Sequence, residues 1–398
     1  MIPLVLHTLV AMLPPLIHRR SSIWLHTIQL LPSCHISPNA RIARSAVQIM
    51  GAPMLGVSGG LLAAETCRAG GLGFLAAGHL TSSLDSEIEI LRQHAPNSPL
   101  CIGFIGHSTY GGDARGWRAF EEVLQTHRPD VVQFFAPAIA RKGGHSTTAA
   151  TNVDLAHAHG ALVMAQVGSA ADAAEALESG VDAIIAQGSE AGGHGLRREV
   201  GSGTLPLAAR IVGLAAPNGI PVLAAGGICD GRTMAGMMSV GCDGVVLGTR
   251  LWASNEALGN ARFKEKLAKA TSGDDVVRTQ SFDAIWNSYR SIQWPDPYDS
   301  CGALRNDITD KWDTRQRELE KVLDSAAPPA WMEKYKHANE VGDSDMAAVL
   351  CGQGVGEVEG IEPTFDIVAR INDEAITTIT SLPKRVLLNN DDDDNGRS

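Results

Sequence analysis

Between residues 46 and 270, short apolar runs alternate with segments of helical periodicity, and this alternation constrains the fold more than any other feature of the chain. The runs are typical of buried strands, and the segments between them are typical of amphipathic helices. Eight strand-helix units in about 225 residues match the period and size of a (β/α)8 barrel. We therefore expect an α/β fold, a TIM barrel, over 46–270. The apolar runs lie at 47–54, 71–78, 99–106, 131–137, 161–168, 181–188, 220–227 and 244–249.

The last two apolar runs both end in small, flexible residues. Gly226 and Gly227 follow the seventh run, Gly248 and Thr249 follow the eighth, and Asp230 is placed to cap the helix between them. Glycine lets backbone N–H groups approach an anion closely, and the loops after strands 7 and 8 of such barrels often bind phosphate. Either pair alone is equally compatible with a tight turn. Because both pairs occur one strand apart, we expect them to hold a phosphate.

The sixth run leads into the loop with the most reactive composition, Gln187-Gly188-Ser189-Glu190-Ala191-Gly192-Gly193-His194-Gly195. A histidine beyond the carboxyl end of a barrel strand lies on the face where active sites form, and its imidazole can accept a proton near neutral pH. A loop histidine satisfied by a backbone carbonyl is the alternative interpretation. The neighbouring glycine loops favour a catalytic His194. We expect Glu190 to be a helix-terminal acid or to face solvent.

Composition excludes several classes of protein. With 33 basic and 44 acidic residues, the formal net charge is −11, and no nucleic-acid partner is expected. The seven cysteines are scattered without C-x-x-C spacing, which is typical of reduced thiols in an intracellular protein, and we expect Cys229 to pack rather than react. His157 and His159 are two positions apart and do not converge on one face of a helix, so we expect no metal site.

Residues 1–45 differ from the rest of the chain, because no acidic residue precedes Glu65. They are expected to form an N-terminal extension that is either a targeting segment or disordered. A mitochondrial transit peptide, a weak signal anchor and a wrongly chosen start codon are three open interpretations. The apolar run 2–17 is short for a bilayer and is broken by Pro14 and Pro15, so no membrane partner is expected. We expect a cytoplasmic protein, with a mitochondrial location as the alternative.

After residue 270 the alternation stops. Residues 271–345 are rich in aromatic side chains and helical patterns, including an expected long helix at 307–323, and we expect a mainly helical cap that covers the substrate. Residues 346–380 return to an amphipathic helix that is expected to complete the barrel, and 381–398 form an acidic tail. We expect most of the cap's aromatic residues to pack in a core and a few to line the substrate pocket. The aromatic residues of the cap are Phe282, Trp286, Tyr289, Trp294, Tyr298 and Trp312.

Three long motifs resemble, in the same order, those of the nitronate monooxygenases, formerly called 2-nitropropane dioxygenases. They are QIMGAPMLGVSGGLLAAETCRAGGLGFLAAG, QGSEAGGHG and LAAGGICDGRTMAGMMSVGCDGVVLGTRLWASNEA. The resemblance covers about 47–257, with weaker similarity in 302–312 and in the CGQGVG segment. It implies a barrel that binds FMN and agrees with the phosphate site argued above.

The resemblance also implies roles for individual residues. Pro53, Met54 and Gly56 are expected beside the isoalloxazine ring, Gln187 at its polar edge, and Gly192 and Gly193 near the ribityl or phosphate end. Gly226, Gly227, Gly248 and Thr249 are expected to hold the phosphate. His194 matches the family's catalytic histidine. The chain departs from the family pattern where Gly195 and Leu196 separate His194 from Arg197, since relatives often carry an arginine directly after the histidine.

The implied activity is the FMN-dependent oxidation of alkyl nitronates, or of nitroalkanes as well, by O2 to a carbonyl compound and nitrite. The implied partners are the small-molecule substrate and O2, and the oligomeric state stays open. The alternative is an FMN-dependent NAD(P)H reductase of a quinone or enoyl thioester, because related FMN barrels share the phosphate loops. A phosphate-binding barrel without catalysis is a third possibility, against which the complete His194 loop argues.

Overall fold

The computed structural model describes residues 48–78, 84–106, 114–135, 151–290, 294–325 and 327–387. The predicted extension 1–45 and the part of the predicted tail after residue 387 lie outside the described residues. Where the structure describes the chain, no helix is both long and apolar enough to cross a membrane.

Eight parallel strands in the described residues form one sheet in the order β1-β9-β8-β6-β5-β4-β3-β2. The sheet closes on itself, because Met50 in β1 pairs in parallel with Leu72 ahead of β2, and the N–H of Gly51 donates to the carbonyl of Leu72 at 2.9 Å. The predicted (β/α)8 barrel is confirmed. Its strands are β1 (Ile49–Gly51), β2 (Leu75–Gly78), β3 (Cys101–Ile105), β4 (Val131–Phe135), β5 (Leu162–Val167), β6 (Ala183–Gln187), β8 (Val222–Ala225) and β9 (Gly244–Leu247).

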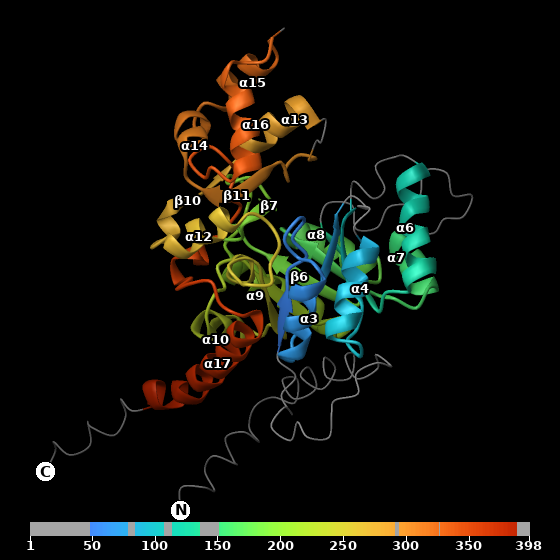
Figure 1. Cartoon of the computed structure of the whole chain (residues 1–398). Coiled ribbons are helices and arrows are strands. Elements are labelled where there is room, and N and C mark those ends of the chain that lie inside the picture. The colour runs from blue at the N-terminus through green and yellow to red at the C-terminus, as the bar shows by residue number, and fades with distance from the viewer. Residues whose placement is uncertain are drawn as a thin grey trace, which may run out of the picture.

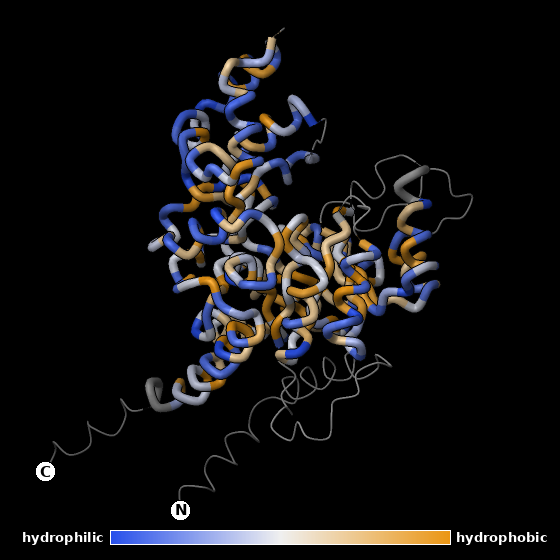
Figure 2. Tube along the Cα trace, viewed as in Figure 1, coloured by the Kyte–Doolittle hydropathy of each residue, from blue (hydrophilic) through white to orange (hydrophobic). Residues whose placement is uncertain are grey.

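Helices alternate with these strands and cover the outside of the barrel. They are α3 (Gly60–Arg68), α4 (Leu84–His94), α6 (Ala114–His127), α7 (Asn152–Ala158), α8 (Ala170–Glu178), α9 (Thr204–Ala215), α10 (Gly231–Ser239) and α11 (Thr249–Trp252). A short 3₁₀ turn follows α9 at Ala216–Asn218. Inward-facing strand residues such as Met50, Met164 and Ile185 fill the barrel interior, and a larger apolar cluster lies between strands and helices. Figure 2 shows the apolar residues concentrated at the barrel centre.

The segment after the barrel contains two strands as well as helices. Helix α12 (Ala261–Lys269) is followed by a 3₁₀ turn (Gly273–Asp275), β10 (Val276–Thr279), α13 (Ser281–Arg290), β11 (Ser300–Leu304), α14 (Asp307–Trp312), α15 (Gln316–Leu323) and α16 (Trp331–Val341). The prediction of a single helix over 307–323 is therefore wrong, because the structure has two helices there. Asp313 ends α14 and holds Arg198 of the barrel loop at 3.0 Å, and the chain turns before α15.

Strand β11 pairs in antiparallel fashion with β10 on one side and with β7 (Gly193–Gly195) on the other, and β7 belongs to the loop after β6. This small sheet lies between the barrel and helices α13 to α16 (Figure 1). It places the loop containing His194 directly against the segment after the barrel.

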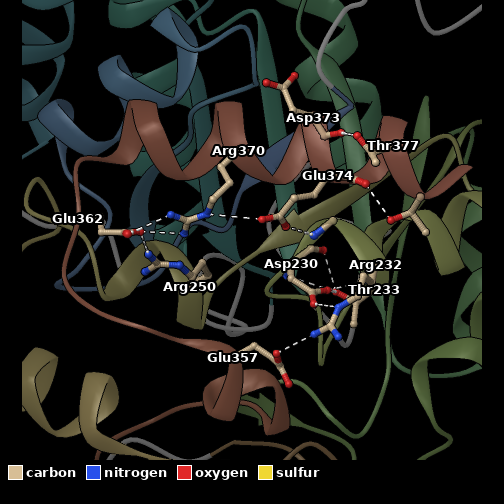
Figure 3. Close-up of polar contacts among 12 residues, drawn as sticks. Asp230, Arg232, Thr233, Arg250, Glu357, Glu362, Arg370, Asp373, Glu374 and Thr377 are labelled. Atoms are coloured by element: carbon tan, nitrogen blue, oxygen red, sulfur yellow. Dashed lines mark hydrogen bonds and ion pairs between the residues drawn. The ribbon is translucent and has the colours of Figure 1, made fainter. Parts of the chain in front are cut away.

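After a 3₁₀ turn (Gln353–Glu357), helix α17 (Thr364–Leu387) packs against α10 and α3 on the barrel wall. Figure 3 shows the polar contacts that attach it. Glu362 accepts hydrogen bonds from both Arg250 and Arg370, and Glu374 accepts one from the N–H of Gly231 at 3.0 Å. The helix extends seven residues beyond position 380, where the barrel-completing segment was expected to end.

Candidate active site

One cavity of about 770 Å³ opens at the carboxyl ends of the barrel strands. It is lined by every residue that the sequence placed in a site. They are Pro53, Met54, Gly56, Gln187, Gly192, Gly193, His194, Gly226, Gly227, Gly248 and Thr249. Since these residues come from the loops after β1, β6, β8 and β9, the barrel closure is what brings them together.

The first glycine pair forms a tight cradle beneath the cavity. Gly226 and Gly227 have φ values of +116° and +70°, which L side chains rarely adopt. A Cβ on Gly226 would lie 2.8 Å from Thr204 Oγ1 and 2.9 Å from the backbone nitrogen of Ala191. A side chain there would therefore collide with its surroundings.

Asp230 caps helix α10, as expected from the sequence. Its carboxylate accepts from the backbone N–H of Thr233 at 2.8 Å, and the hydroxyl of Thr233 lies 2.8 Å from the same oxygen. Because α10 carries its own carboxylate at its N-terminus, that terminus is not open to a phosphate. An anion in the cradle has to be held by the glycine loops themselves.

A second loop, whose residues were not predicted as site residues, completes the cradle from the C-terminal segment. Gly352 and Gly354 line the cavity, and the N–H of Gly352 donates to Thr249 Oγ1 at 2.9 Å. Thr249 still has its hydroxyl proton to donate to a ligand. The closely spaced glycines of the CGQGVG segment were the sequence signal that could have indicated this part of the site.

The loop after β6 is held in place by two charged residues. The Glu190 carboxylate accepts from the N–H and hydroxyl of Thr204, at 2.7 and 2.8 Å, so it caps the N-terminus of α9 from the loop. Arg278 in β10 donates to the carbonyls of Ala191 at 2.6 Å and Ser189 at 3.2 Å. Burial lowers the pKa of Arg278, and the negative charge of Glu190 opposes this shift. Arg278 was not found from the sequence.

Three glutamines form a hydrogen-bonded row across neighbouring strands. Gln187 donates to the carbonyl of His194 at 2.7 Å, so its amide oxygen is left to accept from Gln166 at 2.8 Å. Gln166 in turn accepts from Gln133 at 2.9 Å. Within the described residues, the buried Oε1 of Gln133 has no partner. All three line the cavity, and the unpartnered oxygen of Gln133 is buried in its wall.

His194 is contacted on an edge and a face of its ring. Its Nε2 lies 2.7 Å from Oδ1 of Asp283 in α13, and its ring stacks on Trp294 with centroids 3.9 Å apart and an angle of 12° between the planes. Trp286 lies farther off, with centroids 6.0 Å apart. Of the aromatic residues singled out from the sequence, Trp286 and Trp294 line the cavity. Asp283 was missed.

Other polar residues near the site have structural partners. Arg197 forms a two-pronged hydrogen bond with Asp299, both distances 2.7 Å, so it is not free to bind a substrate anion. Burial raises the pKa of the Cys229 thiol to about 12, in agreement with a packing role. His157 lies 2.8 Å from Asp182, away from the cavity. Among the described residues, no three side chains of His, Cys, Asp or Glu form a group that could hold a metal.

The cavity fits a flat cofactor that carries a phosphate. Its volume lies within the range of about 300–1,000 Å³ typical of small-molecule sites. A glycine cradle closed to side chains lies at one end, and an unused amide acceptor lies in the wall. The fold and the site together define a (β/α)8-barrel enzyme with a histidine beside a cofactor cavity.

Comparison with known proteins identifies the family. A sequence model described as nitronate monooxygenase matches residues 39–373. A nitronate monooxygenase of Metarhizium robertsii is 31% identical over 351 residues, which cover 84% of this chain and 92% of that protein. The chain therefore belongs to the nitronate monooxygenase family, a family of flavin-dependent oxidoreductases.

Solved structures agree with the barrel. FabK of Thermotoga maritima has a TM-score of 0.64 and 26% identity, covering 85% of this chain and 96% of its own. A nitroalkane oxidase of Streptomyces ansochromogenes has the same TM-score and 25% identity, covering 84% and 97%.

Proposed function

We propose that this enzyme binds FMN and oxidises alkyl nitronates, and neutral nitroalkanes as well, with O2 to a carbonyl compound and nitrite. The observation that carries the proposal is the position of His194, which lies in one cavity with the glycine cradle and the glutamine row. The family membership supports the oxidation of nitronates. The small-molecule substrate and O2 are the proposed partners.

The residues that would hold FMN are the ones around the cavity. Gly226, Gly227, Gly248 and Thr249 would take the phosphate, Gly192 and Gly193 would lie near the ribityl or phosphate end, and Gln187 would face the polar edge of the ring. Pro53, Met54 and Gly56 would lie beside the ring. FMN, when bound, supplies the acceptor for the electrons that leave the substrate.

The side chains of the enzyme act on the substrate's proton and position. A neutral nitroalkane has to lose its α-proton before it becomes a nitronate, and His194 is the base that would remove it. Trp286 and Trp294, which line the cavity from the segment after the barrel, would shield the reacting atoms from water. A preformed nitronate needs no base, so His194 would only orient it.

The proposed division of the chain follows the same scheme. Residues 46–270, completed by 346–380, would form the FMN-binding barrel, and 271–345 would cover the substrate. A cytoplasmic location, with a mitochondrial one as the alternative, stays a prediction, because residues 1–45 are outside the described chain.

The deciding experiment measures nitrite release and oxygen uptake by the purified yellow protein with propionate 3-nitronate and with a neutral nitroalkane. Nitrite formed without NADPH supports the proposal. His194→Asn is expected to retain FMN and to lower kcat for the nitroalkane by about 10²–10⁴-fold, far more than for the nitronate. Equal losses on both substrates would contradict the role of His194 as a base.

A reductase is the second candidate, because the fold resembles FabK and the nitroalkane oxidase to the same degree. The candidate is an FMN-dependent NAD(P)H reductase of a quinone or an enoyl thioester. Rapid bleaching of the flavin by NADPH without oxygen, together with no nitrite release, would favour it over the monooxygenase.

A further inference from the structure

Asp283 reaches His194 from a part of the chain that lies outside the three long motifs. It is the third residue of α13, in the first turn, where the helix dipole favours a negative charge. Its side chain is 9% exposed and lines the cavity, and its Oδ1 lies 2.7 Å from His194 Nε2. One ring nitrogen of His194 is therefore already occupied by a partner 89 positions away.

The identity of that partner decides where the proton of a neutral His194 resides. An ionised carboxylate can only accept, so a hydrogen bond with Asp283 requires the proton on Nε2. The lone pair is then on Nδ1. The assignment follows from the chemistry of the pair rather than from an observed hydrogen.

Other contacts hold the ring and the backbone of His194 in place. Trp294 stacks on one face of the imidazole at 3.9 Å, and Gln187 holds the carbonyl of His194 at 2.7 Å. The backbone of His194 also pairs with Cys301 in β11. A ring held at its face and its backbone keeps the nitrogen that faces Asp283, and a side chain fixed by such neighbours is preorganised for proton transfer.

We propose that Asp283 is a positioning residue that fixes the Nε2–H tautomer of His194 and so makes Nδ1 the base for neutral nitroalkanes. The inference rests on the proposed function. In this step the α-carbon–hydrogen bond breaks, its proton forms a bond with Nδ1, and its electron pair stays on the substrate as the nitronate. The imidazolium that forms then carries Nε2–H toward the negative charge of Asp283.

The surroundings of Asp283 suit this role. Its second oxygen, Oδ2, is buried and has no hydrogen-bond partner within the described residues, and its first oxygen, Oδ1, holds the bond to His194. Cys301 lies nearby as a neutral thiol, because burial raises its pKa well above the ordinary value and the Asp283 charge adds to the effect. Arg278 contributes a positive charge from β10.

A purely structural role is the competing explanation, since the bond also links the barrel loop to the segment after the barrel. Asp313 provides a matched control. It holds Arg198 of the same loop at 3.0 Å, is 11% exposed in its side chain, and does not line the cavity. If Asp283 were only a link, Asp283→Asn and Asp313→Asn would have similar effects.

The kinetic experiment compares these two variants as flavin-containing enzymes. We expect Asp283→Asn to lower kcat for a neutral nitroalkane by about 10²–10⁴-fold and kcat for a preformed nitronate by less than about tenfold. Asp313→Asn is expected to change neither rate. Asp283→Glu is expected to restore part of the nitroalkane activity. An equal loss on both substrates, or wild-type enzyme that oxidises nitronates but not nitroalkanes, would overturn the proposal.

A second measurement reads the tautomer without any turnover, and it stands even if folding of Asp283→Asn is impaired. Wild-type holoenzyme labelled with ¹⁵N-histidine is compared with His194→Ala, which identifies the His194 signals among those of the 13 histidines. We expect a protonated Nε2 and an unprotonated Nδ1 above neutral pH. A protonated Nδ1 in the neutral ring would overturn the proposal. Failure of the proposed function would instead appear as absent nitrite release with the expected tautomer present.

Discussion

Gly352 donates its backbone N–H to Thr249 Oγ1 at 2.9 Å and so joins two segments that are 103 positions apart in the sequence. Thr249 begins α11 directly after β9, and Gly352 precedes the 3₁₀ turn that leads to α17. Both residues line the cavity at the proposed phosphate end. The C-terminal segment is therefore part of the site as well as part of the barrel wall.

Thr249→Val keeps the shape of the side chain and removes its hydroxyl. We expect FMN to bind about tenfold more weakly, because the variant loses a donor to the phosphate and leaves the N–H of Gly352 without its acceptor. Titration of the flavin-free protein with FMN, followed by flavin fluorescence, measures the change. Thr249→Ser retains the hydroxyl and is expected to bind nearly as the wild type does. Equal affinity of Thr249→Val and wild type would remove Thr249 from the site.

The unused acceptor of Gln133 gives a second prediction about FMN. Gln133→Leu removes a buried oxygen that has no partner among the described residues, together with one hydrogen bond to Gln166. We expect the flavin-free protein to unfold within a few degrees of wild type, because losing an unpartnered buried oxygen stabilises the fold and losing the hydrogen bond destabilises it. We expect FMN to bind about tenfold more weakly. Thermal unfolding and FMN titration test the two parts. Unchanged FMN affinity would mean that Gln133 faces no polar group of the cofactor.

Gly227→Leu tests the cradle. The residue has φ +70°, and a Cβ would lie 3.2 Å from Cβ of Glu190, so a leucine is both strained and directed against the loop that lines the cavity. We expect purified protein without bound flavin. Gly236→Ala in α10 is the control, because nothing lies within 4 Å of its Cβ position and alanine favours a helix. Full flavin occupancy in folded Gly227→Leu, judged by circular dichroism and absorbance, would refute the phosphate assignment.

The sequence predicts the part of the site that local pattern determines. Glycines directly after apolar runs mark the strand ends, and the count of strands is enough to place His194 and the glycine pairs at one face of the barrel. Asp283, Arg278 and Gly352 could not be placed in this way. An acid in the first turn of a helix is ordinary, and a buried arginine in a short strand has no distinguishing pattern. Their roles depend on tertiary contacts across 80 positions or more.

The same limit applies to the fold. The barrel follows from a repeated local period, whereas β11 pairs with only three residues of the His194 loop, and so short a pairing leaves no alternation to detect. The break between α14 and α15 was missed because helical periodicity continues across it. Asp313 at the break forms an ion pair with Arg198 of the barrel loop, and local sequence does not reveal such a tertiary contact.

The ionic contacts of α17 predict how stability depends on pH. Glu362 accepts hydrogen bonds from the fully buried Arg250 and from Arg370 (Figure 3). The hydrogen bond from Arg370 and the charges of both arginines hold the pKa of Glu362 below its ordinary value of 4.5. A carboxyl group with a lowered pKa stabilises the folded state above its unfolded pKa, and this contribution is lost as the pH falls through the folded pKa.

Glu362→Gln is therefore expected to lower the free energy of unfolding by about 2 kcal/mol at pH 7, since it leaves a buried guanidinium without its counter-charge. The difference from wild type should shrink as the pH falls below 4.5, and it should vanish once the pH has passed through the lower pKa of Glu362 in the folded state, because Glu362 is then protonated in the folded wild type as well. Urea unfolding of both proteins at several pH values measures this difference in the free energy of unfolding. Glu357→Gln is the control, because its partner Arg232 is 70% exposed and such surface pairs contribute about 0–1 kcal/mol. A difference that stays constant from pH 7 to pH 3 would show that Glu362 stabilises the chain by packing rather than by its charge.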